Sequence, residues 1–383
     1  MATILSPTAG TVTKRRLGDL AILGGLPAFD QPLYVGRPNL GDRVRFLTRV
    51  DRIFERRWFS NDGPVAQELE ARLAAFLDVK HCIAVANATL GLQLIVQATG
   101  LSGEVIVPSF TFIATAHALK WQGIEPVFCD IDPSTHNIDP DRIEQLITPR
   151  TSGILGVHLW GRPCDVTSLE AVANKHSLRL LFDAAHALGC SHEGRLVGGF
   201  GSAEVFSFHA TKFFNSFEGG AITTNDDDLA RRLRAMRNFG YDSSGEIVAL
   251  GMNAKMHEVS AAMGLSSLEG IDEFIDANRR NWQDYTECLE DVRGIRLIDF
   301  DRTERHNYQY IVLQIDEAVT GITRDALQRV LIAENVAARR YFYPPCHLQF
   351  PYETASPEMR DRLVVTERLG HWSVPPPSRA STP

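Results

Sequence analysis

A series of short apolar runs, separated by longer connections, most limits what this chain can fold into. The runs are rich in β-branched residues and are apolar on both faces, which is typical of strands buried in a mostly parallel sheet. They comprise residues 82–86, 105–107, 127–129, 153–157, 178–182, 204–208 and 221–224. The connections can hold helices, for example over 90–98 and 169–176. We therefore predict a large α/β domain with helices on both faces of the sheet.

The flanking segments suggest three further parts of the chain. Residues 1–30 lack strong periodicity and are expected to be a loosely tied N-terminal arm, so the large domain would span 31–269. From residue 270 the pattern changes to longer helical stretches with a strand-like run at 310–314, which predicts a smaller C-terminal α/β domain over 270–372. Residues 373–383 are rich in proline, which disrupts helices, and we expect a mobile tail there.

Composition excludes several classes of function. The chain has 383 residues and a formal net charge of -8, which argues against a nucleic-acid partner. No apolar window is long enough to span a membrane, and no signal peptide is evident. The six cysteines form no CxxC pair and have no histidine at metal-ligand spacing, so no metal site is expected. These features predict a cytoplasmic protein.

Ligands of open parallel sheets bind outside the carboxyl ends of the strands. The segments that follow the predicted strands are therefore the candidates for chemistry, and they comprise residues 87–91, 109–112, 183–186 and 207–212.

Lys212 follows a predicted strand in a segment with almost no other charge. A lysine near apolar groups has a depressed pKa, which suits Schiff-base chemistry with a carbonyl. A surface lysine whose stem packs on apolar neighbours explains this segment equally well.

Asp183 ends another predicted strand, where a carboxylate is costly to bury unless it is paired. A protonated pyridine nitrogen would pair with it, but an N-cap for the next helix is an equally good interpretation. His186, three residues on, could reach the same ring. The small residues around Ala88 and Thr89, at a predicted strand-to-helix turn, would offer backbone N–H groups and a hydroxyl to a phosphate.

Taken in order, these segments closely resemble the DegT/DnrJ/EryC1/StrS family of sugar aminotransferases, which are fold-type I pyridoxal-phosphate (PLP) enzymes. The resemblance runs from about residue 34 to residue 352. Its markers lie at residues 105–112, 126–132, 156–162, 183–186, 207–212, 218–220 and 251–256.

The resemblance implies a role for each matching residue. Lys212 would hold PLP covalently and then move protons, and Asp183 would pair with the pyridine nitrogen. His186 would contact the ring hydroxyl, and Phe112 would lie against the ring face. Ala88, Thr89 and Ser207 would hold the phosphate, and Asn253 would reach the phosphate of a neighbouring subunit, which implies a homodimer with shared sites. The family usually has glycine where this chain has Ala88, a change that leaves the backbone donors in place.

Within the family, the chain resembles the enzymes that aminate C4 of dTDP-4-keto-6-deoxyglucose in antibiotic sugar pathways, through residues 34–39, 57–64, 208–217 and 339–347. The partners implied are a nucleotide-linked keto sugar and an amino-acid donor, with L-glutamate expected. Some relatives with histidine in place of the lysine are dehydratases, so Lys212 favours amino transfer. A 3-keto-sugar or cyclitol aminotransferase and a non-catalytic relative are the alternatives. Tyr341, Tyr343 and His347 are candidate substrate contacts, with ordinary packing an equal alternative.

Overall fold

A seven-stranded mixed sheet forms the centre of the molecule in the computed structural model, which describes residues 12–353 and 357–374. Its strand order is β2-β10-β9-β6-β5-β3-β4, and only β10 runs antiparallel to its neighbours. The strands are β2 (His81–Val85), β3 (Glu104–Pro108), β4 (Glu125–Cys129), β5 (Thr151–Val157), β6 (Arg179–Asp183), β9 (Ala203–Ser207) and β10 (Gly220–Thr224). All seven predicted strands are present, and the α/β aminotransferase fold expected from the sequence is confirmed.

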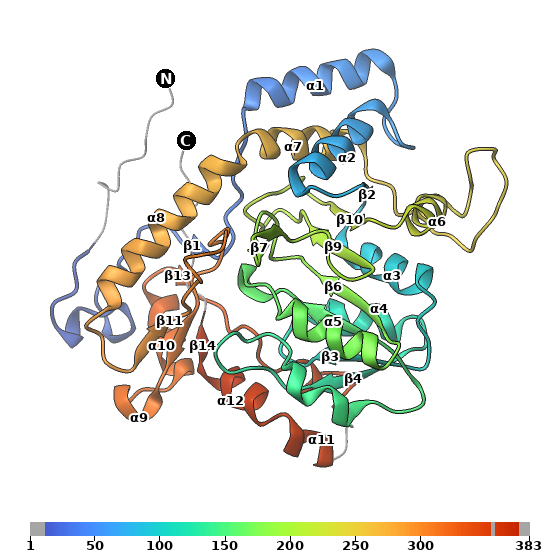
Figure 1. Cartoon of the computed structure of the whole chain (residues 1–383). Helices are drawn as coiled ribbons and strands as arrows, with labels where there is room; N and C mark the ends of the chain where they lie inside the picture. Colours follow the sequence, from blue (N-terminus) through green and yellow to red (C-terminus); the bar gives the residue numbers. More distant parts are fainter. Residues whose placement is uncertain (1–11, 354–356, 375–383) are drawn as a thin grey trace.

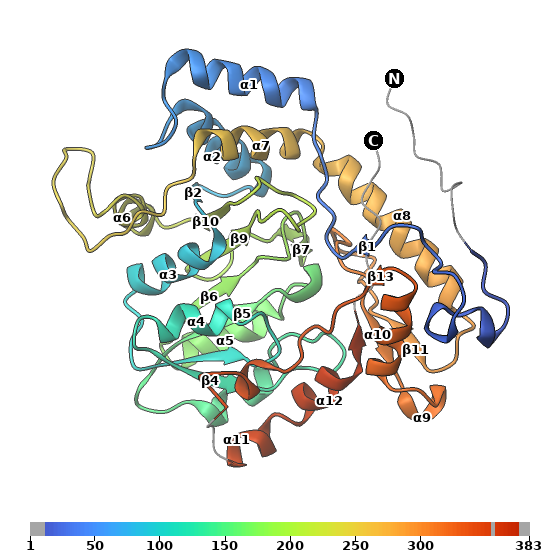
Figure 2. The same cartoon turned by 180° about the vertical axis from the view of Figure 1, so that it is seen from behind.

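Helices cover both faces of this sheet, as Figures 1 and 2 show. Side chains of α2 (Pro64–Leu77), α5 (Val166–Lys175) and α7 (Glu258–Glu269) form one apolar core with one face. Those of α3 (Ala88–Ala98), α4 (Ala114–Lys120) and α6 (Asp227–Arg237) form a second core with the other face. Burial on both faces explains why the strands are continuously apolar.

A smaller α/β unit lies beside the large one, and the long helix α8 leads into it from α7 (Figure 1). Its antiparallel sheet has the order β11-β12-β14, and a two-stranded parallel ribbon pairs β1 with β13. These strands are β1 (Leu33–Tyr34), β11 (Ile295–Leu297), β12 (Leu313–Ile315), β13 (Val336–Ala337) and β14 (Ser373–Val374). The helices of the unit are α8 (Ile271–Leu289), α9 (Glu317–Thr320), α10 (Arg324–Ala333), α11 (Pro357–Arg362) and α12 (Val364–Trp372). The short hairpin β7 (Ser191–His192) and β8 (Arg195–Leu196) belongs to the connection after β6.

Three details differ from the sequence-based expectations. The strand-like run at 310–314 is a strand only over Leu313–Ile315. Ser373 and Val374, expected in the tail, pair with β12; the rest of that tail lies outside the described residues. The third difference is β1, which was assigned to the large domain but pairs with β13 of the small unit.

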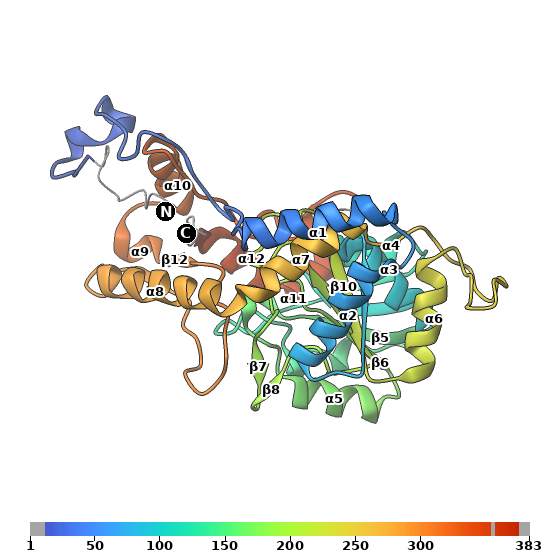
Figure 3. The same cartoon turned by 90° about the horizontal axis from the view of Figure 1, so that it is seen from above.

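The described part of the N-terminal arm is tied to the small unit by Glu334. This carboxylate accepts hydrogen bonds from the backbone N–H groups of Ala21 and Ala28, each at 2.7 Å, and forms an ion pair with Lys14 at 3.0 Å. Figure 3 shows the arm beside α10. Residues 12–30 are thus attached more firmly than we expected from their lack of apolar periodicity. The attachment is by a few polar contacts, and such contacts leave no repeating apolar pattern in the sequence.

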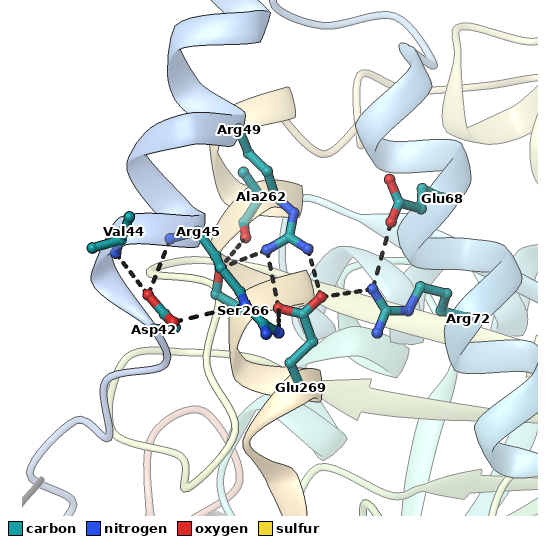
Figure 4. A network of polar contacts seen from close by, with 9 residues as sticks. All are labelled: Asp42, Val44, Arg45, Arg49, Glu68, Arg72, Ala262, Ser266 and Glu269. Atoms are coloured by element: carbon teal, nitrogen blue, oxygen red, sulfur yellow. Dashed lines mark hydrogen bonds and ion pairs between the residues drawn. The ribbon is translucent and has the colours of Figure 1, made fainter.

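A network of charges around Glu269, at the end of α7, joins α7 to α2 and to α1 (Arg43–Arg56) (Figure 4). Glu269 accepts hydrogen bonds from Arg49 at 2.5 Å and from Arg72 at 2.9 Å, and Arg45 lies 3.5 Å away. Burial alone would raise the pKa of this carboxyl, but the two hydrogen-bonded arginines lower it to about 2. An ionised Glu269 therefore contributes to the contact of α1 with α2 and α7, beside the apolar packing of Ile53.

We expect Glu269→Gln to lower the free energy of unfolding at pH 7 by about 1–3 kcal/mol, because the charge that three arginines share is removed. The folded-state pKa lies below the unfolded one, so this contribution is complete above pH 4.5 and is lost as the pH falls toward 2. Urea unfolding at several pH values should show the gap between wild type and variant narrowing below pH 4.5. Glu68→Gln is the control, since Glu68 contacts Arg72 from an exposed position. Equal effects of the two substitutions would contradict the role given to Glu269.

Among the described residues, no helix is long and apolar enough to cross a membrane.

Candidate active site

A cavity of about 370 Å³ opens at the carboxyl ends of the parallel strands, and residues from the small unit complete its wall. The lining includes the residues that follow β2, β3, β6 and β9, which is the position expected of a ligand site in an open sheet. Residues of the large unit at the cavity are Asn87, Ala88, Thr89, Leu92, Thr111, Phe112, Ala114, Val157, Leu159, Asp183, Ala185, His186, Ser207, His209, Thr211, Lys212 and Glu218. Those of the small unit are Tyr310, Arg339, Tyr341 and Phe342.

Lys212 lies in the turn after β9, and its amine reaches into the cavity. The Nζ atom lies 3.2 Å from the Tyr310 hydroxyl and 5.6 Å from the centre of the Tyr310 ring. Burial lowers the pKa of the amine to about 8, although the charges of Asp183 and Tyr341 act in the opposite direction. A substantial fraction of this amine is therefore neutral near pH 7.5, as a nucleophile toward a carbonyl requires.

Asp183 is the last residue of β6 and is buried. Its Oδ2 atom accepts a hydrogen bond from the Thr115 hydroxyl at 2.8 Å, and Oδ1 accepts one from the Ala185 N–H at 3.1 Å. Burial raises the pKa of the carboxyl, and these two hydrogen bonds, followed by the charge of Lys212, offset part of the effect. Asp183 thus places a buried carboxyl group at the cavity, and it does not cap a helix, since a turn follows β6.

His186 stacks on Trp160, with ring centres 5.8 Å apart and planes inclined by 24°. The Trp160 backbone N–H donates to Nδ1 at 3.3 Å, and Nε2 lies 3.4 Å from the Tyr310 hydroxyl. Burial lowers the pKa of the imidazole well below its usual value, and the charge of Lys212 lowers it further. The ring is therefore neutral at physiological pH.

The N-terminus of α3 forms one wall of the cavity. Asn87 is the N-cap, and its side chain accepts a hydrogen bond from the Leu90 N–H at 2.9 Å. The N–H groups of Ala88 and Thr89 belong to the first turn, where helix geometry provides no intrahelical partner. Gly220 of β10 packs beneath them: a Cβ at this position would lie 2.9 Å from the Ala88 nitrogen and 2.7 Å from the Phe206 carbonyl oxygen. The absence of a side chain at Gly220 lets the helix N-terminus approach the strand ends closely.

The cavity gathers most, but not all, of the residues predicted from the sequence. Lys212, Asp183, His186, Phe112, Ala88, Thr89, Ser207 and Tyr341 all line it. Two of the three candidate substrate contacts do not. The Tyr343 ring lies under the Arg324 guanidinium at 4.4 Å, and His347 is buried between Ser109, at 2.7 Å, and Glu367, at 3.2 Å. A contact of these two residues with substrate stays a prediction.

Asn253 also lies outside the cavity lining and is exposed in the single chain. Its backbone forms an isolated antiparallel bridge with Asn238, at the base of the loop that follows α6. The expected contact of Asn253 with the phosphate of a neighbouring subunit therefore stays a prediction.

Three residues of the site were missed by sequence reasoning. Tyr310 was assigned only to a strand, although its hydroxyl contacts Lys212 and His186, which lie 98 and 124 positions away in the chain. Thr115, which donates to Asp183, comes from α4, and no pattern links it to a residue 68 positions away. Arg339 lies in the segment 339–347 that resembles the family, but its residue type alone predicted no role there. Pairs at such separations are fixed by tertiary structure alone.

Comparisons with known proteins show which family the chain belongs to. The profile of the DegT/DnrJ/EryC1/StrS aminotransferase family matches residues 42–382. A dTDP-4-amino-4,6-dideoxy-D-glucose transaminase from Shigella dysenteriae is 40% identical over 315 residues, covering 82% of this chain and 86% of the relative. A dTDP-3-amino-3,6-dideoxy-alpha-D-galactopyranose transaminase from Aneurinibacillus thermoaerophilus is 36% identical over 336 residues, covering 86% and 89%. The crystal structure of DesI in the presence of its TDP-sugar product superimposes with a TM-score of 0.90 at 54% identity, covering 94% and 92% of the two chains.

The fold, and a cavity lined by both a lysine amine and a buried carboxyl group, are those of an aminotransferase. This chain belongs to the DegT/DnrJ/EryC1/StrS aminotransferase family, as the sequence motifs indicated.

Proposed function

We propose that this protein transfers an amino group from L-glutamate to C4 of dTDP-4-keto-6-deoxyglucose and that it uses PLP as cofactor. The observation that carries the proposal is the joint placement of Lys212 and Asp183 in one cavity, on a chain 54% identical to DesI, whose structure was determined with a TDP-sugar product. The product would be a dTDP-4-amino-4,6-dideoxy sugar, which is what the name of the Shigella relative describes.

The residues present fit PLP at every part of that molecule. The amine of Lys212, with its pKa of about 8, suits the aldehyde, and the Asp183 carboxylate suits a protonated pyridine nitrogen. The N–H groups of Ala88 and Thr89, joined by the Ser207 hydroxyl, suit a phosphate at a helix N-terminus. We assign ring contacts to Phe112 and His186, which line the same cavity. Among the described residues no cluster suits a metal ion.

When bound, PLP supplies an electron sink for the negative charge that develops on the substrate carbon. Asp183 would hold the ring nitrogen protonated, and Thr115 fixes the orientation of that carboxylate. The Lys212 amine would act as the general base that removes the α-proton of glutamate and as the acid that returns a proton on the other side of the transfer. The reaction is ping-pong, since the donor's amino group must be left on the enzyme before the keto sugar reacts.

Both substrates are anionic, and Arg339 is placed to meet them. Glutamate carries two carboxylates and a sugar nucleotide carries a diphosphate, whereas the chain as a whole is negatively charged. Arg339 reaches the cavity from the small unit and donates a hydrogen bond to the Tyr341 hydroxyl at 3.0 Å. We assign substrate contacts to Arg339 and Tyr341, and a rise in KM for both substrates in Arg339→Met would support this assignment.

We further propose that the active form is a homodimer with shared sites. The loop after α6 projects from the body of the molecule (Figures 1 and 3) and carries Tyr241, Ile247, Val248 and Leu250, all of them exposed. Apolar side chains in such number on a projecting loop are typical of an interface. Asn253 lies at the base of this loop, in line with the expected contact to a partner's phosphate. Light scattering on the purified protein tests the proposal, and a monomer at micromolar concentration would contradict it.

The cysteines agree with a reducing compartment, and we place the protein in the cytoplasm. All six are free thiols, and five of them are buried, where they pack as small apolar side chains. Fractionation of the source cells tests this placement.

A half-reaction on purified protein tests the function. The protein is loaded as its pyridoxamine phosphate form, mixed with dTDP-4-keto-6-deoxyglucose, and followed by visible absorbance and by analysis of the sugar nucleotide. Return of the absorption band of the lysine-bound cofactor, together with a 4-amino sugar nucleotide, is the expected result. Protein that holds the cofactor but does not react with this ketone would contradict the substrate assignment. The 3-keto-sugar alternative would then be tested first, since a 3-amino-sugar transaminase is 36% identical to this chain. A cyclitol ketone would be tested next, and failure to hold the cofactor at all would favour a non-catalytic relative.

A further inference from the structure

Tyr310 contacts the reacting nitrogen of the site from the small unit. It lies just before β12, and its ring is buried against Trp160 and His186, with ring centres at 5.4 Å and 4.7 Å. Its hydroxyl lies 3.2 Å from Lys212 Nζ and 3.4 Å from His186 Nε2. The hydroxyl therefore stands between the catalytic amine and a neutral imidazole.

The direction of these hydrogen bonds follows from the backbone of Trp160. Its N–H donates to Nδ1 of His186, so this nitrogen carries a lone pair and no proton. A neutral imidazole has one proton, which must then be on Nε2, the atom that faces Tyr310. His186 donates to the Tyr310 oxygen, and the hydroxyl hydrogen is left to point elsewhere.

In the part of the chain that the structure describes, Lys212 Nζ is the other polar atom within hydrogen-bond distance of that hydroxyl. A neutral amine has a lone pair that can accept the hydrogen, whereas an ammonium group has none. With a neutral amine, one continuous chain satisfies every group, from the Trp160 N–H through His186 and Tyr310 to Lys212. With an ammonium, the tyrosine oxygen would receive two donors and its own hydrogen would lose this acceptor.

We propose that Tyr310 is a further catalytic residue, whose hydroxyl, oriented by His186, donates a hydrogen bond to Lys212 and holds it as a neutral amine ready to accept a proton. This inference rests on the proposed function in one respect, the use of Lys212 as the general base. Tyr310 belongs to the small unit and Lys212 to the large one. The hydrogen bond that activates the base therefore forms only when the two units are in contact.

Other charged and titratable groups line the same cavity as the amine. Asp183 comes from β6, and Tyr341 and Arg339 come from the small unit. His209 and Glu218 lie on the connection between β9 and β10. A test must therefore compare substitutions that leave all of these in place, and Tyr310→Phe does so because it removes one oxygen and keeps the ring.

The first measurement is made on the apoprotein, without cofactor or substrate. Trace acetic anhydride labels lysines only as neutral amines, so the labelling of the Lys212 peptide against pH, read by mass spectrometry, gives the pKa of this amine. We expect Tyr310→Phe to raise the pH midpoint of Lys212 labelling by about 0.5 to 1 pH unit. A shift of this size corresponds to the loss of one hydrogen bond to the neutral amine. Tyr308→Phe is the matched control, since Tyr308 packs against Trp282 and Phe300, away from the cavity.

The direction in which the labelling midpoint of Lys212 moves in Tyr310→Phe distinguishes the two possible hydrogen-bond arrangements. If Tyr310 merely accepted a hydrogen bond from an ammonium, its loss would lower the midpoint. A lowered or unchanged midpoint would overturn the proposal. A circular dichroism spectrum and a melting temperature of the variant show that the labelled protein is folded.

The second measurement is the glutamate half-reaction of the holoenzyme, with ordinary and with α-deuterated glutamate. Removal of the α-proton should slow by about 10- to 100-fold in Tyr310→Phe, within the range of acid–base effects, and the deuterium isotope effect should grow. Unchanged rates would overturn the proposal. Neither measurement uses a sugar nucleotide, so failure of the proposed keto sugar as substrate would leave this inference standing and is distinguishable from its failure.

Discussion

Lys212→Ala is expected to abolish amino transfer, with kcat/KM falling by about 10⁴-fold or more. A single positioned acid–base group supplies up to about 10⁴-fold, and the covalent attachment of the cofactor is lost in addition. The visible band of the lysine-bound cofactor should also disappear. The cavity left by the side chain would admit a small amine, so added methylamine should restore part of the rate of the glutamate half-reaction. Stopped-flow absorbance of that half-reaction measures both effects.

Lys175→Ala is the matched control, because Lys175 is exposed and pairs only with Glu144 at 2.7 Å among the contacts described. It should keep full activity. Turnover that survives in Lys212→Ala without added amine would contradict the assignment of the base, and with it the proposed mechanism.

The large sheet could be predicted from the sequence because its strands are buried on both faces. Each strand is therefore a run of apolar residues that needs no knowledge of its neighbours, as in β5 and β6. The small unit was harder to predict. Its strands are two or three residues long, too short for any period to be visible, and β1 joins β13 across some 300 positions of chain.

The residues of the site also fall into those that could be predicted from the sequence and those that could not. Lys212, Asp183 and Ser207 could be predicted because each lies at or shortly after the end of an apolar strand, where the chain direction of a parallel sheet brings such residues together. Tyr310 and Thr115 were not found, because their roles come from contacts between separate elements. Tyr343 and His347, two of the three candidate substrate contacts, lie outside the cavity lining. They lie in the same short segment as Tyr341, but neighbouring residues of an irregular segment point in different directions, and of these three residues Tyr341 alone lines the cavity.

Asp183→Asn is expected to reduce kcat/KM by about 10²- to 10³-fold while leaving the protein folded. The amide cannot hold a proton on a pyridine nitrogen, so the ring would lose most of its capacity as an electron sink. The geometry should survive, because Asn can still accept the hydrogen bond from the Ala185 N–H and can donate one to the Thr115 hydroxyl, which then acts as acceptor. Steady-state kinetics with glutamate and the keto sugar measures the loss.

The same substitution should not destabilise the apoprotein. A loss of activity without a loss of stability would show that the Asp183 carboxylate serves the reaction and not the fold. Burial raises the pKa of Asp183 above its unfolded value, so the folded protein holds a proton there more readily than the unfolded chain. Stability therefore falls as the pH rises from the unfolded pKa of about 4 through the folded pKa, and ionised Asp183 opposes folding at pH 7. Asp183→Asn removes that cost, and the melting temperature of the apoprotein at pH 7 should stay the same or rise. Asp165→Asn, at the exposed N-cap of α5, is the control expected to leave activity intact. A large drop in melting temperature for Asp183→Asn would mean that the carboxylate is a structural element of the fold, and a normal kcat/KM would remove it from the mechanism.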